Sequence, residues 1–129
     1  MASATSAPKR VLIVDDDPDL RALLVMGLEL AGYRCVAAEN GAAAMPLVQA
    51  QAFDVILLDL QMPVMDGLRF LEWLRQEVRN PAPVLVFTSV DADAEGREIC
   101  DKVMAAGATG VLSKPARLPA ILEKLGGLL

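Results

Sequence analysis

A chain of 129 residues fits one domain with a single hydrophobic core, which at this size needs neither disulfides nor a structural metal. Its net charge of −5, without any basic run, argues against direct binding to nucleic acid or to an anionic membrane surface. No apolar run approaches the ~20 residues of a membrane-spanning helix, and residues 1–10 lack the apolar core of a signal peptide, so we expect a cytoplasmic protein without membrane contact.

The N-terminal part of the chain predicts a leader, a strand and a helix. Residues 1–8 are small and polar without periodicity, which indicates a disordered leader. Residues 11–14 are all apolar and predict a buried strand. Asp17-Pro18 begins a helix, with an N-cap carboxylate and a proline at the first helical position, and Gly32 ends it. Apolar residues recur along this helix at helical spacing: Leu20, Leu23, Leu24, Gly27, Leu28 and Ala31.

The middle of the chain predicts two further strands and two helices. Residues 33–38 form a strand, and 42–51 form an Ala-rich helix that Pro46 should kink or shorten. Residues 55–58 are another fully apolar strand. The next helix opens at Asp66-Gly67, and its apolar face is predicted to consist of Leu68, Leu71, Leu74 and Val78.

The C-terminal part predicts two strands and two helices. Residues 84–87 form a strand, and the more polar helix at 92–106 ends at Gly107. Its inner face is predicted to contain Ile99, Val103 and Ala106. A short strand at 110–112 precedes a final helix whose apolar residues are Leu118, Ile121, Leu122, Leu125 and Leu129.

Five strands that alternate with five helices predict an α/β fold, a doubly wound parallel sheet with right-handed crossovers. We expect one domain at residues 9–129 with strand order 2-1-3-4-5, in which the first and third strands flank the point where the order reverses. Cys35 and Cys100 have no metal-like spacing, so we expect reduced thiols without a functional role.

Polar residues stand where the predicted strands end. Asp15 and Asp16 leave the first strand, Asp59 the third, Thr88 the fourth and Lys114 the fifth, so all five should lie at one edge of the sheet. Three carboxylates about 5 Å apart repel by roughly 3 kcal/mol per pair at an effective dielectric near 20. A lysine and a hard divalent cation with oxygen ligands, best Mg²⁺, would offset that repulsion. Such a site suits phosphoryl transfer.

These residues carry a resemblance to a known family. From about Lys9 to the C-terminus, the chain resembles the response-regulator receiver domain of two-component signalling, which implies a flavodoxin-like fold. Each motif is weak alone, but five in order at strand ends form a specific set. The motifs are Asp15-Asp16, Asp59 with Met62-Pro63, Asp66-Gly67, Thr88, and Gly107-Ala-x-Gly110 before Lys114-Pro115.

The resemblance implies a role for each site residue. Asp59 would be the phospho-acceptor, taking the phosphoryl group from a sensor histidine kinase or a histidine phosphotransfer protein. Asp15, Asp16, Asp59 and the backbone carbonyl of Gln61 would hold Mg²⁺, with Mn²⁺ as the alternative ion. Thr88 would hydrogen-bond the phosphoryl group and Lys114 would pair with it, Lys114-Pro115 being a cis bond. The domain would then be a phospho-acceptor that assists its own phosphorylation and dephosphorylation, not an enzyme in the ordinary sense.

In similar domains a partner or output domain reads the face formed by the fourth helix, fifth strand and fifth helix, here residues 92–106 and 111–129. The family usually has Tyr or Phe three residues before the lysine, a ring whose rotation accompanies activation, and this chain has Val111. Either phosphorylation is coupled to this output face through Thr88 and helix movement alone, or the domain passes the phosphoryl group along and does not switch a target. A receiver-like interaction module that works without phosphorylation is the alternative function.

Two other classes fit the residues less well. A flavodoxin-like cofactor binder needs N–H groups and hydroxyls for its phosphate, and Asp15-Asp16-Asp17 would repel one. An aspartyl-phosphate phosphohydrolase would have an acid at position 61, where this chain has Gln61. The chain has no histidine, so the phosphohistidine must come from a partner. Whether it acts alone or within a longer protein stays open at this point.

Overall fold

The computed structural model describes residues 8–60, 67–79, 81–88, 94–113 and 117–129. Ten elements alternate along the chain. They are β1 (Arg10–Val14), α1 (Pro18–Leu30), β2 (Arg34–Ala38), α2 (Gly41–Ala50), β3 (Val55–Asp59), α3 (Gly67–Glu77), β4 (Val84–Thr88), α4 (Ala94–Ala105), β5 (Gly110–Ser113) and α5 (Leu118–Leu128).

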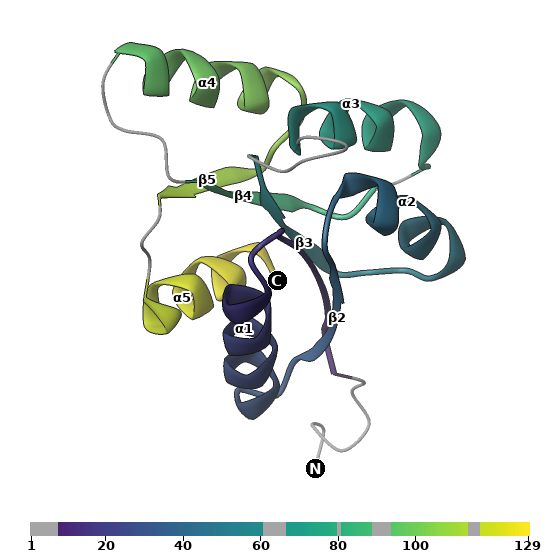
Figure 1. Ribbon diagram of the computed structural model, residues 1–129, viewed down its shortest axis with the longest axis vertical. Helices are drawn as coiled ribbons and strands as arrows, with labels where there is room; N and C mark the ends of the chain where they lie inside the picture. The colour runs from purple at the N-terminus through teal and green to yellow at the C-terminus, as the bar shows by residue number, and fades with distance from the viewer. Residues whose placement is uncertain (1–7, 61–66, 80, 89–93, 114–116) are drawn as a thin grey trace.

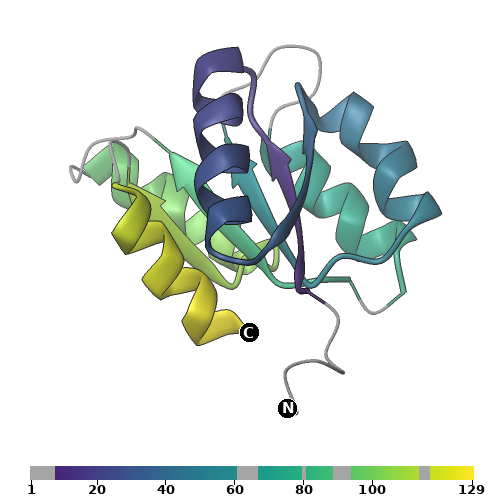
Figure 2. The same ribbon diagram turned by 90° about the horizontal axis from the view of Figure 1, so that it is seen from below.

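The five strands form one sheet in the order β2-β1-β3-β4-β5, and every neighbouring pair is parallel. Helices α1 and α5 cover one face of this sheet, while α2, α3 and α4 cover the other (Figure 1). Figure 2 shows the same layers after a quarter turn, with α1 and α5 in front of the strands. The predicted fold class and strand order are therefore confirmed.

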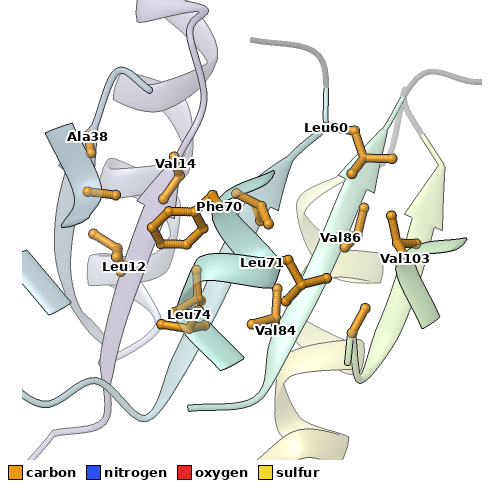
Figure 3. Packing of buried hydrophobic residues seen from close by; sticks show 14 residues of the cluster. Leu12, Val14, Ala38, Leu60, Phe70, Leu71, Leu74, Val84, Val86 and Val103 are labelled. Carbon is orange, nitrogen blue, oxygen red and sulfur yellow. The ribbon is translucent and has the colours of Figure 1, made fainter. Parts of the chain in front are cut away.

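The core consists of two apolar layers, one on each face of the sheet. Successive side chains of a strand point to opposite faces, so a strand that is covered on both sides is apolar throughout. Leu12 and Val84 pack toward α3, where Phe70 and Leu71 are fully buried (Figure 3). The alternate strand residues pack against α1 and α5, in a cluster that includes Val11, Ile13, Leu57, Leu85, Leu24, Leu28, Ile121 and Leu125.

Helix ends follow the local signals in the sequence. Asp17 is the N-cap of α1, and its side chain accepts hydrogen bonds from the backbone N–H groups of Asp19 and Leu20. Gly32 has φ +100° and Gly107 has φ +111°, the left-handed conformation that glycine adopts without strain after a helix. Helix α2 continues through Pro46 to Ala50, so the proline does not end it.

One apolar residue of α1 is exposed, and several predicted features fall outside the described residues. Leu23 shares the helical spacing of Leu24 and Leu28, yet its side chain is 60% exposed, because the helix presents only a narrow stripe to the sheet. Residues 1–7 of the leader predicted at 1–8, Asp66 and the start of the predicted helix at 92–93 lie outside the described residues. Within the part of the chain that the structure describes, no helix is both long enough and apolar enough to span a bilayer.

Candidate functional site

Three aspartates meet at the carboxyl ends of the two central strands. Asp15 follows β1, Asp59 is the last residue of β3, and the pairing of Val14 with Leu58 sets the two acids at the same level. Asp15, Asp16 and Asp59 each offer one carboxylate oxygen, and these oxygens all lie within 4.8 Å of one another. The predicted convergence of the three acids is therefore correct. It occurs between β1 and β3, where the order of the sheet reverses.

Two of the three aspartates are buried away from solvent, and the third is exposed to it. Asp15 is 2% exposed and Asp59 is 4% exposed, whereas Asp16 is exposed to solvent. Ionised carboxylates in such a setting need hydrogen-bond donors or a cation close by. Three hard oxygen donors, one of them facing solvent, match the ligands that Mg²⁺ takes in proteins, where it keeps several waters. The residues present therefore fit a magnesium ion.

Several hydrogen bonds fix Asp15. Its backbone N–H donates to the carbonyl oxygen of Ala38, at the end of β2, over 3.1 Å. Its Oδ1 accepts from the N–H of Asp17 over 2.9 Å, and its carbonyl oxygen accepts from Nη1 of Arg21 over 2.7 Å. The loop after β1 is thus attached both to the neighbouring strand and to the first turns of α1.

The backbone around Asp59 is held by the start of α3. The N–H of Gly67 donates to the carbonyl oxygen of Leu60 over 3.0 Å. A Cβ at position 67 would lie 2.7 Å from Cα of Leu60 and would overlap the carbonyl oxygen of Asp59. Glycine at position 67 therefore allows α3 to begin directly against the backbone that carries the aspartate.

Arg21 is a site residue that motif reasoning missed. The available signal was its place in the fourth position of α1, since helical side chains lean toward the N-terminus of the helix and so toward the preceding loop. This direction of the side chain does not specify which atom accepts its hydrogen bond. The contact with Asp15 depends on the path of the loop after β1.

The other predicted site residues are described less fully. Thr88 ends β4, and its backbone pairs with Ser113 at the end of β5. Gln61 and the Lys114-Pro115 pair lie outside the described residues. Val111 in β5 is half-buried, pairs with Val86 and packs against the core. Cys35 and Cys100 are both free thiols, as expected.

Comparisons with known proteins agree with this geometry. The family model of the response regulator receiver domain matches residues 11–126. The chain is 34% identical to the probable transcriptional regulatory protein TcrX of Mycobacterium tuberculosis, over 100% of this chain and 53% of TcrX. The chain thus spans about half the length of the curated relatives that it matches first.

Two solved structures have the same fold. Chemotaxis protein CheY4 of Vibrio cholerae matches with a TM-score of 0.86 and 34% identity, over 95% of this chain and 100% of that one. The response regulator TrrA of Thermotoga maritima, solved in complex with Mg²⁺-BeF, matches with a TM-score of 0.79 and 31% identity, over 94% and 99% of the two chains. Because the family model covers nearly the whole chain and the fold and strand order agree with it, the chain belongs to the response regulator receiver domain family of two-component systems.

Proposed function

We propose that this receiver domain takes a phosphoryl group onto Asp59 from the phosphohistidine of a sensor histidine kinase or a histidine phosphotransfer protein, in a reaction that depends on Mg²⁺. The observation that carries the proposal is the convergence of three carboxylate oxygens within 4.8 Å, two of them on nearly buried residues. A site of that kind has a high density of negative charge, and a divalent cation is the natural partner for it.

In the proposed reaction a carboxylate oxygen of Asp59 attacks the phosphorus atom. The bond between phosphorus and the donor's imidazole nitrogen breaks, and its electron pair returns to the imidazole. The product is an acyl phosphate on Asp59. Asp15 and Asp16, with the backbone carbonyl of Gln61, are proposed to hold Mg²⁺ together with Asp59, and Mn²⁺ is the second choice. Bound Mg²⁺ supplies charge neutralisation for the phosphoryl oxygens. The Mg²⁺-BeF complex of TrrA supports the choice of ion.

Two more residues complete the proposed site. Asp59 pairs with Phe87 across β3 and β4, so Thr88 follows one residue beyond the level of the acceptor. Thr88 in turn pairs with Ser113, directly before Lys114 in the sequence. We assign Thr88 the hydrogen bond to the phosphoryl group and Lys114 the ion pair with it.

The proposed consequence is a switch in the face that α4, β5 and α5 form, because the acyl phosphate adds charge and acceptor oxygens at the edge where β4 and β5 end. The partner or output domain that reads this face is not identified by the site. TcrX is named a transcriptional regulatory protein and is about twice as long, so within a longer protein an output domain that binds DNA fits the proposal. The net charge of −5 still argues that this chain does not bind DNA directly, and the cytoplasm is the proposed location.

Val111 favours a second candidate function, an interaction module that works without phosphorylation. In place of a ring that can rotate, β5 carries a half-buried valine packed on the core. Phosphorylation at Asp59 separates the two candidates.

The test is incubation of the protein with Mg²⁺ and acetyl phosphate, followed by intact-mass measurement. We expect the wild type to gain one phosphoryl group and to lose this gain when EDTA is present. Asp59→Asn should gain none, whereas Asp101→Asn, the same change on the exposed side of α4, should match the wild type. An unlabelled wild type, under conditions that label a known receiver domain, would favour the interaction module. Equal labelling of Asp59→Asn would show that the acceptor is another residue.

A further inference from the structure

The Arg21 side chain reaches from α1 back to the loop that carries the acidic residues. Arg21 is the fourth residue of α1, and its backbone N–H donates to the carbonyl oxygen of Asp17 over 2.9 Å. Its Nη1 donates to the carbonyl oxygen of Asp15 over 2.7 Å in a partly buried contact. One residue therefore connects the first turn of the helix with the residue that follows β1.

This contact acts on the main chain of a site residue. Asp15 is 2% exposed, and the pairing of β1 with β2 and β3 ends one residue before it, at Val14. A buried carbonyl oxygen is costly when it has no donor, and a charged donor makes the stronger hydrogen bond. Arg21 thus fixes the Asp15 peptide at its oxygen while Ala38 fixes it at its nitrogen. Together with the N–H of Asp17, which donates to Oδ1 of Asp15, these contacts help to set the direction in which the Asp15 carboxylate leaves the backbone.

We propose that Arg21 is a positioning residue, which holds Asp15 so that its carboxylate can bind Mg²⁺ jointly with Asp16 and Asp59. The inference rests on the proposed magnesium site and deepens it, since it assigns part of the Mg²⁺ affinity to a residue outside the ligand set. Arg21 acts through the backbone of Asp15 and is not itself a ligand or a catalytic residue.

Two effects of Arg21 on Mg²⁺ affinity have opposite signs. Its positive charge repels a cation, so removing the charge alone would tighten Mg²⁺ binding. Loss of the hydrogen bond would let Asp15 turn away and would weaken binding. We expect the second effect to dominate, because the guanidinium is partly exposed and its field is screened, whereas removing a group that orients a metal ligand typically weakens metal binding by 10–100-fold.

The experiment measures the dissociation constant of Mg²⁺ by calorimetry for the wild type, Arg21→Ala, Arg21→Lys and Arg34→Ala. Arg34 is exposed at the start of β2, at the opposite end of the sheet from Asp15, and its removal makes the same change in net charge. We expect the dissociation constant to rise about tenfold in Arg21→Ala. Arg21→Lys, which keeps a charged donor, should recover most of the affinity, and Arg34→Ala should match the wild type. Urea titrations confirm that each variant is folded at the temperature used, and Arg21→Gln replaces the alanine variant if that one is not.

A second readout separates positioning from general damage to the fold. In Arg21→Ala the rate of phosphorylation by acetyl phosphate should need about ten times more Mg²⁺ for half-saturation, yet reach the wild-type maximum when Mg²⁺ is saturating. If the wild type binds Mg²⁺ and Arg21→Ala binds it equally or more tightly, the positioning role is wrong and the proposed function stands. If the wild type binds no Mg²⁺, the proposed site fails and the positioning role fails with it.

Discussion

Asp15 and Asp59 are charged side chains in an environment that usually contains apolar ones. They are 2% and 4% exposed; Asp15 follows the buried residues 11–14 of β1, and Asp59 ends β3, which is buried throughout. Asp17 and Arg21 donate hydrogen bonds to the Asp15 residue and compensate part of its lost hydration. The mutual repulsion of the carboxylates is not relieved by these bonds. At the scale of single residues, the site therefore concentrates negative charge, which the proposed Mg²⁺ would help to neutralise.

Cys35, which lies away from this site, allows the effect of burial on a pKa to be tested. The pKa of the Cys35 thiol in β2 is raised from 9.0 to about 11, chiefly by burial and further by the negative charge of Glu29. Between these values the native chain holds the thiol proton and the unfolded chain has released it. The native state thus binds more protons there, and its free energy of unfolding must fall as the pH rises from about 9 to about 11.

We therefore expect the stability difference between the wild type and Cys35→Ser to be constant below about pH 9 and to shift against the wild type above it. Urea unfolding of both proteins at a series of pH values measures this difference. Cys100→Ser is the control for the loss of a thiol. A difference that does not change across the interval would mean that the Cys35 pKa is not raised.

The identity of the site residues was predictable to different degrees. Asp15, Asp16 and Asp59 could be predicted because parallel strands bring their carboxyl ends to one edge, so position in the sequence fixes position in space. Arg21 could not, because its acceptor is a main-chain oxygen that no sequence pattern marks. The structure shows where the three aspartates lie, whereas their roles and those of Thr88, Lys114 and Gln61 stay predictions.

At the scale of elements, the start of α3 lies so close to the end of β3 that position 67 has no room for a side chain. Gly67 is buried, and an added Cβ would meet the backbone of Asp59 and Leu60. Backbone atoms cannot rotate away as a side chain can. A larger residue at position 67 must therefore displace the end of β3 or the start of α3.

Gly67→Ala should lower the free energy of unfolding by about 1–3 kcal/mol, the usual effect of overpacking. It should also slow phosphorylation, because the backbone that must shift carries the proposed acceptor. Gly126→Ala is the matched control. A Cβ at Gly126 in α5 meets no atom within 4 Å, so alanine there should raise stability by up to about 1 kcal/mol and leave phosphorylation unchanged. Equal stability of the two variants in urea titrations would contradict the close approach at Gly67.

Element type was predictable for all ten elements, since apolar runs and helical spacing reflect which faces are covered. Element ends were less so: β3 includes Asp59 and β4 includes Thr88, although both are polar, because the hydrogen-bonded register of the sheet extends one residue past the apolar run. Leu23 shows the same limit within a helix. Both Leu23 and Leu24 fit the helical spacing of apolar residues, and only the packing of α1 on the sheet decides that Leu24 is buried and Leu23 is exposed.

At the scale of the whole molecule, stability and charge at the site work against each other. The two apolar layers hold the sheet together, while the carboxylates at its edge repel one another and favour unfolding. Ligation of Mg²⁺ would remove that repulsion and add binding energy to the native state alone. The fold should thus be more stable with the metal than without it, by an amount that depends on Asp59.

In EDTA, Asp59→Asn should be more stable than the wild type by about 1–3 kcal/mol, because it removes the charge that repels Asp15 and Asp16. With Mg²⁺ at a hundred times its dissociation constant, the wild type should gain about 2.7 kcal/mol. Asp59→Asn should gain less, so its advantage in free energy of unfolding over the wild type should shrink or reverse. Urea unfolding with and without Mg²⁺ measures all four values, and Asp101→Asn should follow the wild type in both conditions. An Asp59→Asn variant that is less stable than the wild type in EDTA would mean that the Asp59 carboxylate makes favourable contacts that outweigh its repulsion, and that the cluster is a structural one.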